Sequence, residues 1–137
     1  MSGKHAHIEK ARRNEAALSR FDFEPDLYEW YLTVSFYAAV HWIRAYLAHA
    51  GQFTGEREQP TYEQFPRLVR DTLRAQHGAG YSGGDAALDA FLDLKTLSQE
   101  ARYKCRPPAW YARQTGDADA ALSVIREFVR GEGIDPQ

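Results

Sequence analysis

Apolar residues recur three and four positions apart along almost the whole chain, and strand-like alternation never lasts more than a few residues. This spacing predicts an all-α protein that folds as an antiparallel bundle of four to five helices. We expect helices over about residues 5–20, 26–50, 66–76, 85–106 and 118–130. Proline or glycine lies near several of these boundaries, where such residues begin or end helices.

The second predicted helix is the longest and is apolar around most of its circumference, which predicts a central position in the bundle. Asp26 and Glu29 have the spacing of a capping box at its start, and Gly51 is typical of its end. One purely apolar face predicts packing into the core. Its members are Leu32, Phe36, Ala39, Ile43 and Leu47.

A second face of this helix is half polar and predicts either a groove or the seam of a dimer. Its members are Trp30, Val34, Tyr37, His41, Arg44 and Ala48. In one interpretation His41 is a core histidine satisfied by a hydrogen bond, and Arg44 reaches water along its aliphatic stem. In the other, His41 exchanges a proton near neutral pH and has a chemical role.

A basic segment, residues 101–116, carries a charge of +4 in a chain whose net charge is −2, so the rest of the chain carries −6. Its cations are Arg102, Lys104, Arg106 and Arg113. Pro107 and Pro108 predict that the segment begins on the fourth helix and finishes in a loop. On that loop Trp110 and Tyr111 either plug the end of the bundle or offer a stacking surface. Cations beside aromatic rings favour an anionic partner with planar rings, such as a nucleotide or RNA.

Length and composition are those of one ordinary domain, which we expect to span residues 1–137 with a flexible tail at 131–137. The single cysteine, Cys105, excludes an internal disulfide and favours a reducing compartment, so we expect a cytoplasmic protein. The most apolar run, residues 30–47, contains His41 and Arg44 and therefore predicts a buried helix, not a membrane span. The sequence has no zinc-ligand spacing, phosphate loop or nucleophile elbow, so we expect neither a metal nor another cofactor.

Three segments together resemble a known family: HIEKARRNEAAL in the first helix, FYAAVHWIRAYLA in the central helix and SQEARY in the fourth. Their order and spacing are similar to those of the small HEPN (higher eukaryotes and prokaryotes nucleotide-binding) proteins, over most of the chain up to Tyr103. The resemblance implies a bundle of four or five helices that is often dimeric. Many HEPN proteins are metal-independent ribonucleases of toxin-antitoxin, CRISPR or phage-defence systems, and others are non-catalytic binding or assembly modules.

The resemblance places Arg102 at the arginine of the ribonuclease motif, in which a histidine follows after four to six residues. Positions 107, 108 and 109 are Pro, Pro and Ala, so that histidine is missing. A catalytic site would therefore need His41 of the central helix opposite Arg102. His41 would then deprotonate a ribose 2′-hydroxyl, while Arg102 and Arg106 would stabilise the charge of the phosphorane.

The sequence thus supports three hypotheses. The first is a HEPN-like RNA- or nucleotide-binding protein of a toxin-antitoxin or phage-defence system, acting as a homodimer, with ribonuclease activity left open. Its predicted contact residues are Tyr37, Arg44, Tyr103, Lys104, Arg106, Trp110, Tyr111 and Arg113. The second is a non-catalytic helical adaptor or dimerisation module for a protein partner such as a nucleotidyltransferase or a defence enzyme, and the missing histidine favours it. In the third, Arg102 and Tyr103 only brace the bundle through hydrogen bonds to helix ends.

Overall fold

The structure, a computed structural model, describes residues 3–21, 27–54 and 59–136. It contains five α-helices: α1 (Lys4–Leu18), α2 (Tyr28–His49), α3 (Phe65–His77), α4 (Asp85–Tyr103) and α5 (Pro108–Gly131). A short 3-10 helix, η3 (Tyr62–Gln64), directly precedes α3. No strand occurs within these described ranges. The predicted all-α bundle is therefore confirmed.

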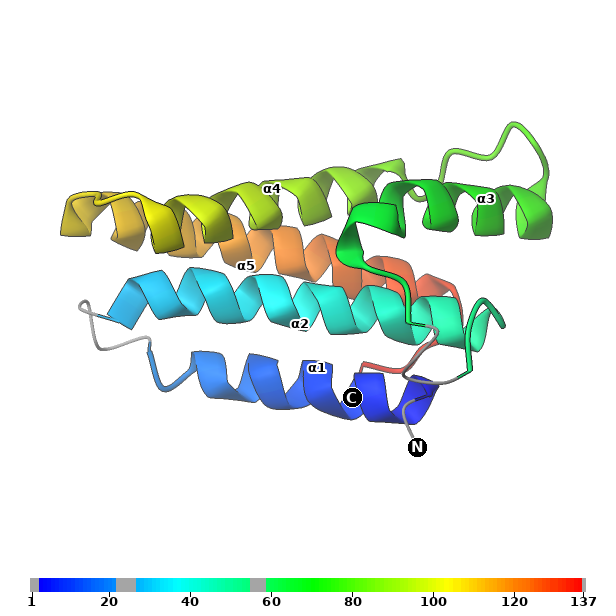
Figure 1. The fold of residues 1–137 in the computed structure, drawn as a ribbon, viewed down its shortest axis with the longest axis horizontal. Helices are drawn as coiled ribbons and strands as arrows, with labels where there is room; N and C mark the ends of the chain where they lie inside the picture. Colours follow the sequence, from blue (N-terminus) through cyan, green and yellow to red (C-terminus); the bar gives the residue numbers. More distant parts are fainter. Residues whose placement is uncertain (1–2, 22–26, 55–58, 137) are drawn as a thin grey trace.

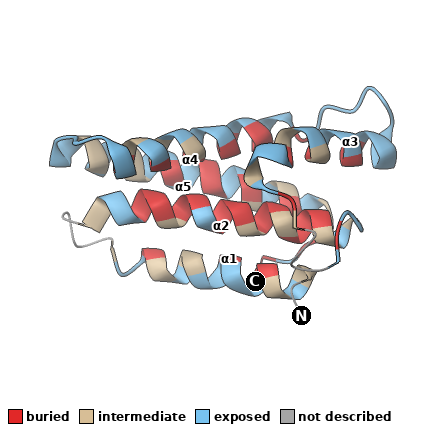
Figure 2. Cartoon of the chain, in the orientation of Figure 1, coloured by how far each residue is buried: buried red, intermediate tan, exposed pale blue. Residues whose placement is uncertain are grey.

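Helix α2 lies at the centre of the bundle, with α1 on one side and α4 and α5 on the other (Figure 1). Helix α3 lies at the end of the bundle where α2 finishes. Most of α2 is buried (Figure 2), and the largest buried side chains of the protein include its Phe36, Trp42 and Tyr46. Each buried ring of this kind contributes on the order of 1.5–3 kcal/mol, so the apolar circumference of α2 organises the core.

Helix α1 is held against the bundle by apolar packing and by the carboxylate of Glu15. The indole Nε1 of Trp42 donates a hydrogen bond to Glu15 Oε2 at 2.5 Å, and Arg126 of α5 lies 3.5 Å from Glu15 Oε1. Burial raises the pKa of Glu15. One carboxylate therefore ties α1 to two other helices. The buried apolar positions of α1 are Ile8, Ala11 and Leu18.

Helix α5 begins at Pro108 and not near residue 118, so the sequence prediction for this boundary was wrong. Pro107 is extended, and Pro108 occupies the first turn of the helix, where a missing N–H has no cost. Gly116 stays inside the helix although glycine costs about 1 kcal/mol relative to alanine there. As a result the basic segment does not finish in a loop: Trp110 and Tyr111 lie on the first turns of α5.

The end of α2 agrees with its sequence signal, since Gly51 follows the helix with a φ of 82°, which glycine adopts without steric strain. Its beginning differs from the predicted capping box. The N-cap is Leu27, which has no side-chain cap, and Asp26 lies outside the described residues.

The C-terminal residues 132–136, which the sequence analysis placed in a flexible tail, pack against the bundle. Ile134 is buried in the core, and Arg12 of α1 donates hydrogen bonds to the carbonyl oxygens of Asp135 and Pro136 at 2.8 and 3.1 Å. The two hydrogen bonds of Arg12 therefore hold the C-terminal segment against α1.

Candidate functional site

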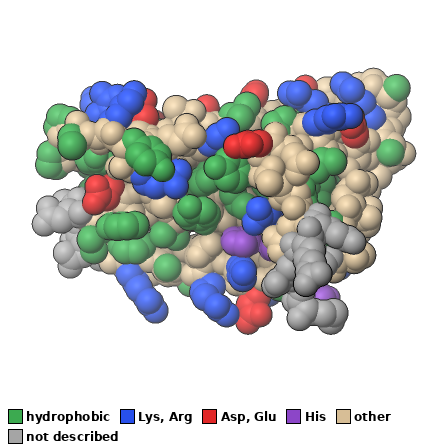
Figure 3. Space-filling view, in the orientation of Figure 1, with side chains coloured by type: hydrophobic (Ala, Val, Ile, Leu, Met, Phe, Trp, Pro, Cys, Tyr) green, Lys and Arg blue, Asp and Glu red, His purple; other side chains and the backbone are tan. Residues whose placement is uncertain are grey.

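One strip of α2 remains open between α1 and α4, and we call it the α2 face. Trp30 and Tyr37 are 52% and 41% exposed, which is unusual for large rings on a central helix. Hydrophobic side chains gather over the first half of α2 in Figure 3, and a histidine with Lys and Arg side chains around it follows them. This strip is the half-polar face predicted from the sequence. Its members are Trp30, Val34, Tyr37, His41 and Arg44.

Arg102 reaches the α2 face from the last turn of α4. Its Nη1 donates to the Tyr37 hydroxyl at 3.4 Å, and its Nε donates to the Ser98 carbonyl at 3.3 Å. The guanidinium carbon lies 5.4 Å from the centre of the Tyr103 ring, which is 77% exposed. Arg102 also lines a small cavity of about 140 Å³ with Trp30 and the acidic residue Glu29. Among the described residues it forms no ion pair, so its charge is available to a ligand.

His41 contacts a second histidine, His7 of α1, which the sequence analysis did not include in the site. The two Nδ1 atoms are 3.0 Å apart, and the rings stack with their centroids 5.2 Å apart. Burial is the main reason that the pKa of each histidine is lowered to about 4; His7 contributes to the lowering at His41, and the charges of Arg44 and Lys10 contribute at both. Both imidazoles are therefore neutral near pH 7, with one Nδ1 donating and the other accepting.

Arg44 continues the α2 face toward η3 and α3. Its Nε donates to the carbonyl oxygen of Pro60 at 3.2 Å, and its guanidinium carbon lies 5.9 Å from the centre of the Phe65 ring. Burial lowers the pKa of Arg44, although the group keeps its charge at any ordinary pH. A half-buried position of this kind is compatible with both interpretations of Arg44, a rim residue and a contact residue for a ligand.

The rest of the basic segment forms a separate cluster around the turn between α4 and α5. Glu100 pairs with Arg106 at 3.2 Å and with Lys104 at 3.9 Å, so two of the four predicted cations share one carboxylate. The Tyr111 hydroxyl donates to the Lys104 carbonyl at 3.1 Å and accepts a hydrogen bond from the Arg106 backbone N–H at 3.4 Å. The Arg106 guanidinium lies 5.4 Å from the centre of the Trp110 ring.

These contacts give Trp110 and Tyr111 a local role, because both rings are half-buried and pack against the core. They close the end of the bundle, which is the first of the two interpretations offered for them. Arg113 is exposed on the next turn of α5. The structure therefore groups Tyr37, Arg102 and Tyr103 at one place and leaves the other predicted contact residues of the basic segment near the turn.

The two residues proposed for catalysis do not contact each other directly. The hydrogen bond of the His41 ring goes to His7, and the hydrogen bonds of Arg102 go to Ser98 and Tyr37. Tyr37 stands between them, one helical turn before His41 on the same face of α2. Among the described residues, no group of three or more His, Cys, Asp or Glu side chains is placed to hold a metal ion.

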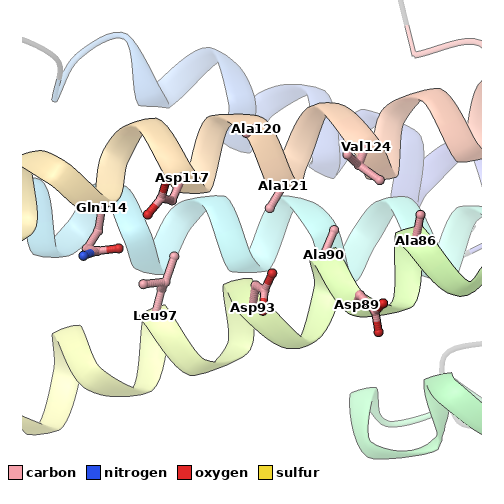
Figure 4. Close-up of a pocket in the computed structure, with 10 residues that line it drawn as sticks. All are labelled: Ala86, Asp89, Ala90, Asp93, Leu97, Gln114, Asp117, Ala120, Ala121 and Val124. Atoms are coloured by element: carbon pink, nitrogen blue, oxygen red, sulfur yellow. The ribbon is translucent and has the colours of Figure 1, made fainter.

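A groove between α4 and α5 was not expected from the sequence. Figure 4 shows alanine side chains along its floor and the carboxylates of Asp89, Asp93 and Asp117 around it. Its volume is about 640 Å³. None of these three carboxylates forms an ion pair or hydrogen bond within the described part of the chain. Three uncompensated negative charges repel a phosphate, so this groove cannot serve the ligand predicted for the basic segment.

Comparisons with known proteins give no family for this chain: no protein-family model matches it, and no curated protein and no solved structure is similar to it. Within the described ranges, no helix combines the length and the apolar character needed to cross a membrane.

Proposed function

We propose that this protein binds single-stranded RNA or a nucleotide across the α2 face and Arg102. The observation that carries the proposal is the contact between Arg102 and Tyr37, which places an unpaired guanidinium among three exposed rings. Stacking of a base on an exposed ring stabilises a complex by about 1–3 kcal/mol and requires no particular base. An arginine beside the rings supplies the phosphate contact.

The proposal keeps the wider expectations drawn from the sequence. It includes the HEPN-like assignment, the toxin-antitoxin or phage-defence setting and the homodimer. Those expectations rest on the three sequence segments that resemble the family, and the geometry of the α2 face is compatible with them.

Cleavage is a separate step that we do not assign to this face. Because the Nδ1 of His41 is engaged by His7, a ribose hydroxyl could reach only its Nε2, which accepts a proton only in the tautomer that leaves Nε2 unprotonated. A base whose pKa is about 4 attracts that proton weakly at pH 7. Binding therefore follows from the geometry more directly than hydrolysis does.

Fluorescence anisotropy with a labelled single-stranded oligoribonucleotide tests the proposal. Trp30→Ala should weaken binding by about 5- to 150-fold, the equivalent of one lost stacking contact. Arg102→Ala should weaken binding and reduce the magnitude of the salt slope by about 0.7, the value for one phosphate contact to a single strand. Arg67→Ala is the matched control, because Arg67 is an exposed arginine of α3 far from the α2 face in sequence and is paired with Asp71 at 3.7 Å.

Two results would refute RNA binding at this face. The first is no binding by the parent protein at low salt. The second is binding that Arg67→Ala weakens as much as Arg102→Ala does, since that pattern indicates general attraction to cations. Both variants replace exposed side chains, so neither should prevent folding.

The α4–α5 groove favours a second candidate function, a helical adaptor for a protein partner. Small side chains on the floor let another helix approach closely, and three carboxylates around the floor select a partner with basic side chains. The occupant we infer is an amphipathic helix with lysine or arginine beside a small-residue stripe. An alanine-rich helical peptide with a lysine face should shift the amide resonances of Asp93 and Asp117, and Asp93→Lys should abolish the shift. No shift in the parent protein would exclude this function.

A further inference from the structure

Four side chains that carry or can carry positive charge converge at the second half of the α2 face. They are His7 and Lys10 from α1, and His41 and Arg44 from α2. Members of each pair are three residues apart, so they lie on one side of their helix. Lys10 and Arg44 are close enough to both imidazoles to lower the pKa of each. The convergence of like charges is unfavourable unless a negative group joins them.

Among the described residues, the surroundings of this cluster supply no such negative group. The ring of Phe53 meets His7 edge-on, with centroids 5.8 Å apart, and the hydrogen-bond acceptor of Arg44 within the described residues is the neutral carbonyl of Pro60. Glu9, beside Lys10 in the chain, pairs with Arg13 at 3.7 Å. Over the described ranges, no carboxylate forms an ion pair or hydrogen bond with His7, Lys10, His41 or Arg44.

The tautomers of the two histidines follow from burial. His7 is only 2% exposed, and its Nε2 is buried without a hydrogen-bond partner. A buried N–H without an acceptor is rarer in proteins than an acceptor without a donor, so Nε2 of His7 is the unprotonated nitrogen. His7 then donates from Nδ1 to His41, and His41 carries its proton on Nε2. His41 is only half-buried, and its Nε2 is not among the enclosed atoms, so an N–H donor faces outward.

We propose that His41, Lys10 and Arg44 form a phosphate-binding subsite in the opening between α1 and α2, with His7 as a positioning residue that fixes the tautomer of His41. One N–H donor and two cations that form no ion pair among the described residues match the oxygens of a phosphate. The Nη atoms of Arg44 make no hydrogen bond within the described structure and complete the donor set.

This subsite rests on the proposed function for its natural ligand, the phosphate of an RNA or nucleotide. His41 lies four residues beyond Tyr37, about 6 Å along the helix at 1.5 Å per residue. A chain stacked on Trp30 and Tyr37 and held by Arg102 would therefore reach the subsite with a neighbouring phosphate. Inorganic phosphate can occupy the subsite alone, because the subsite needs no base.

Occupation of the subsite should be coupled to proton uptake. A bound anion favours the charged form of a histidine, so the pKa of His41 and His7 in the complex must rise above the value of about 4 in the free protein. Affinity should then increase as pH falls, by up to tenfold for each unit by which the anion raises the pKa of the pair. A subsite built only from Lys10 and Arg44 would show no such dependence between pH 5 and 8.

Nuclear magnetic resonance of the histidine rings tests the subsite in the full chain. Inorganic phosphate at pH 7 should give a saturable shift of the His41 Nε2 signal, and the ¹⁵N shifts of the free protein should show His41 protonated at Nε2. Sulfate, which keeps its charge between pH 5 and 8, should bind more tightly at pH 5.5 than at pH 7.5. His77 is the internal reference, because its ring is bonded to Glu132 at 3.1 Å, a carboxylate that repels anions.

Lys10→Ala should weaken phosphate binding by about 2- to 5-fold without loss of folding, since Lys10 is exposed. His7→Phe should move the His41 proton to Nδ1 or leave its position unspecified, and should flatten the pH dependence of anion affinity.

Two results would overturn the proposal. One is a chemical-shift change that rises linearly with phosphate and is equal at His41 and His77, and the other is a His41 protonated at Nδ1 in the free protein. If phosphate binds but RNA does not, the subsite stands and the proposed function fails. If RNA binds while phosphate leaves the His41 signal unchanged, the proposed function stands and the subsite fails.

Discussion

The buried histidine pair makes the stability of this protein depend on pH in a calculable way. In the unfolded chain each histidine has a pKa near 6.5, whereas burial lowers the pKa of His7 and of His41 to about 4 in the native state. The unfolded chain therefore binds more protons than the native protein between these values. The free energy of unfolding is therefore not reduced by the pair above pH 6.5, and it decreases as pH falls from 6.5 toward 4.

The magnitude follows from the two pKa values. At pH 5.5 each histidine should lower the free energy of unfolding by about 1.3 kcal/mol relative to pH 7.5, and both together by about 2.7 kcal/mol if they titrate independently. Because His41 is only half-buried, water screens part of its contribution and these values are upper limits. The raised pKa of Glu15 acts in the opposite direction. The native protein binds a proton at Glu15 more readily than the unfolded chain does, so this group increases the free energy of unfolding as pH falls. The contribution of Glu15 cancels when a histidine variant is compared with the parent protein, because both contain Glu15.

Urea unfolding followed by circular dichroism at pH 7.5, 6.5 and 5.5 measures this dependence. His41→Gln should remove about half of the decrease seen in the parent protein, whatever its effect at pH 7.5. His5→Gln is the matched control, since His5 is exposed on α1, and it should follow the parent curve. The reasoning is refuted if the parent protein is as stable at pH 5.5 as at pH 7.5, or if His41→Gln leaves the decrease unchanged.

Three further substitutions have effects that the structure specifies, each measured as the change in unfolding free energy. Gly116→Ala should stabilise the protein by about 1 kcal/mol, because Gly116 lies within α5 and an added Cβ meets nothing within 4 Å; destabilisation would contradict the position of α5. Ser98→Ala should be neutral or stabilising by up to about 1 kcal/mol, because the Ser98 hydroxyl is buried without a partner. Glu15→Ala should destabilise by about 1–3 kcal/mol, since it leaves the Trp42 N–H unpaired, whereas Glu15→Gln should restore most of the loss.

The helical fold could be predicted because its signal is local and repeated. Apolar spacing identified five helices, and the end of α2 was specified by one glycine. The start of α5 could not be found in the same way. Two principles compete at Pro107 and Pro108: proline interrupts the helix before it, and it also favours the first turn of the helix after it. Gly116 does not end the helix either, because one glycine inside a helix costs only about 1 kcal/mol relative to alanine.

The candidate site was predictable only where it lay on one helix. Trp30, Tyr37 and His41 share a face of α2 by their spacing alone, so the sequence predicted that they lie together, and the role of that face in binding stays a prediction. His7 could have been recognised as buried, since it lies four residues before Ala11 on the core side of α1, but its contact with His41 depends on how α1 docks against α2. The pairing of Glu100 with Lys104 and Arg106 could not be predicted either, because a count of charges along the chain does not show which charges lie close together in space.

The open α2 face requires a physical explanation, since Trp30 and Tyr37 leave apolar area in water that a small helical protein would gain by burying. Two occupants would cover it, a nucleic acid or a second copy of this chain, and they respond differently to salt. Contacts of Arg102 with phosphates weaken as salt rises, whereas a seam of aromatic rings between two copies is driven by apolar burial and does not. We expect sedimentation at 50 and 500 mM salt to leave the oligomeric state of the free protein unchanged, and Arg102→Ala to reduce RNA binding without altering that state. If Trp30→Ala instead converts a salt-resistant dimer into a monomer while RNA affinity is unaffected, the face is a seam between copies, and the RNA-binding proposal must be abandoned.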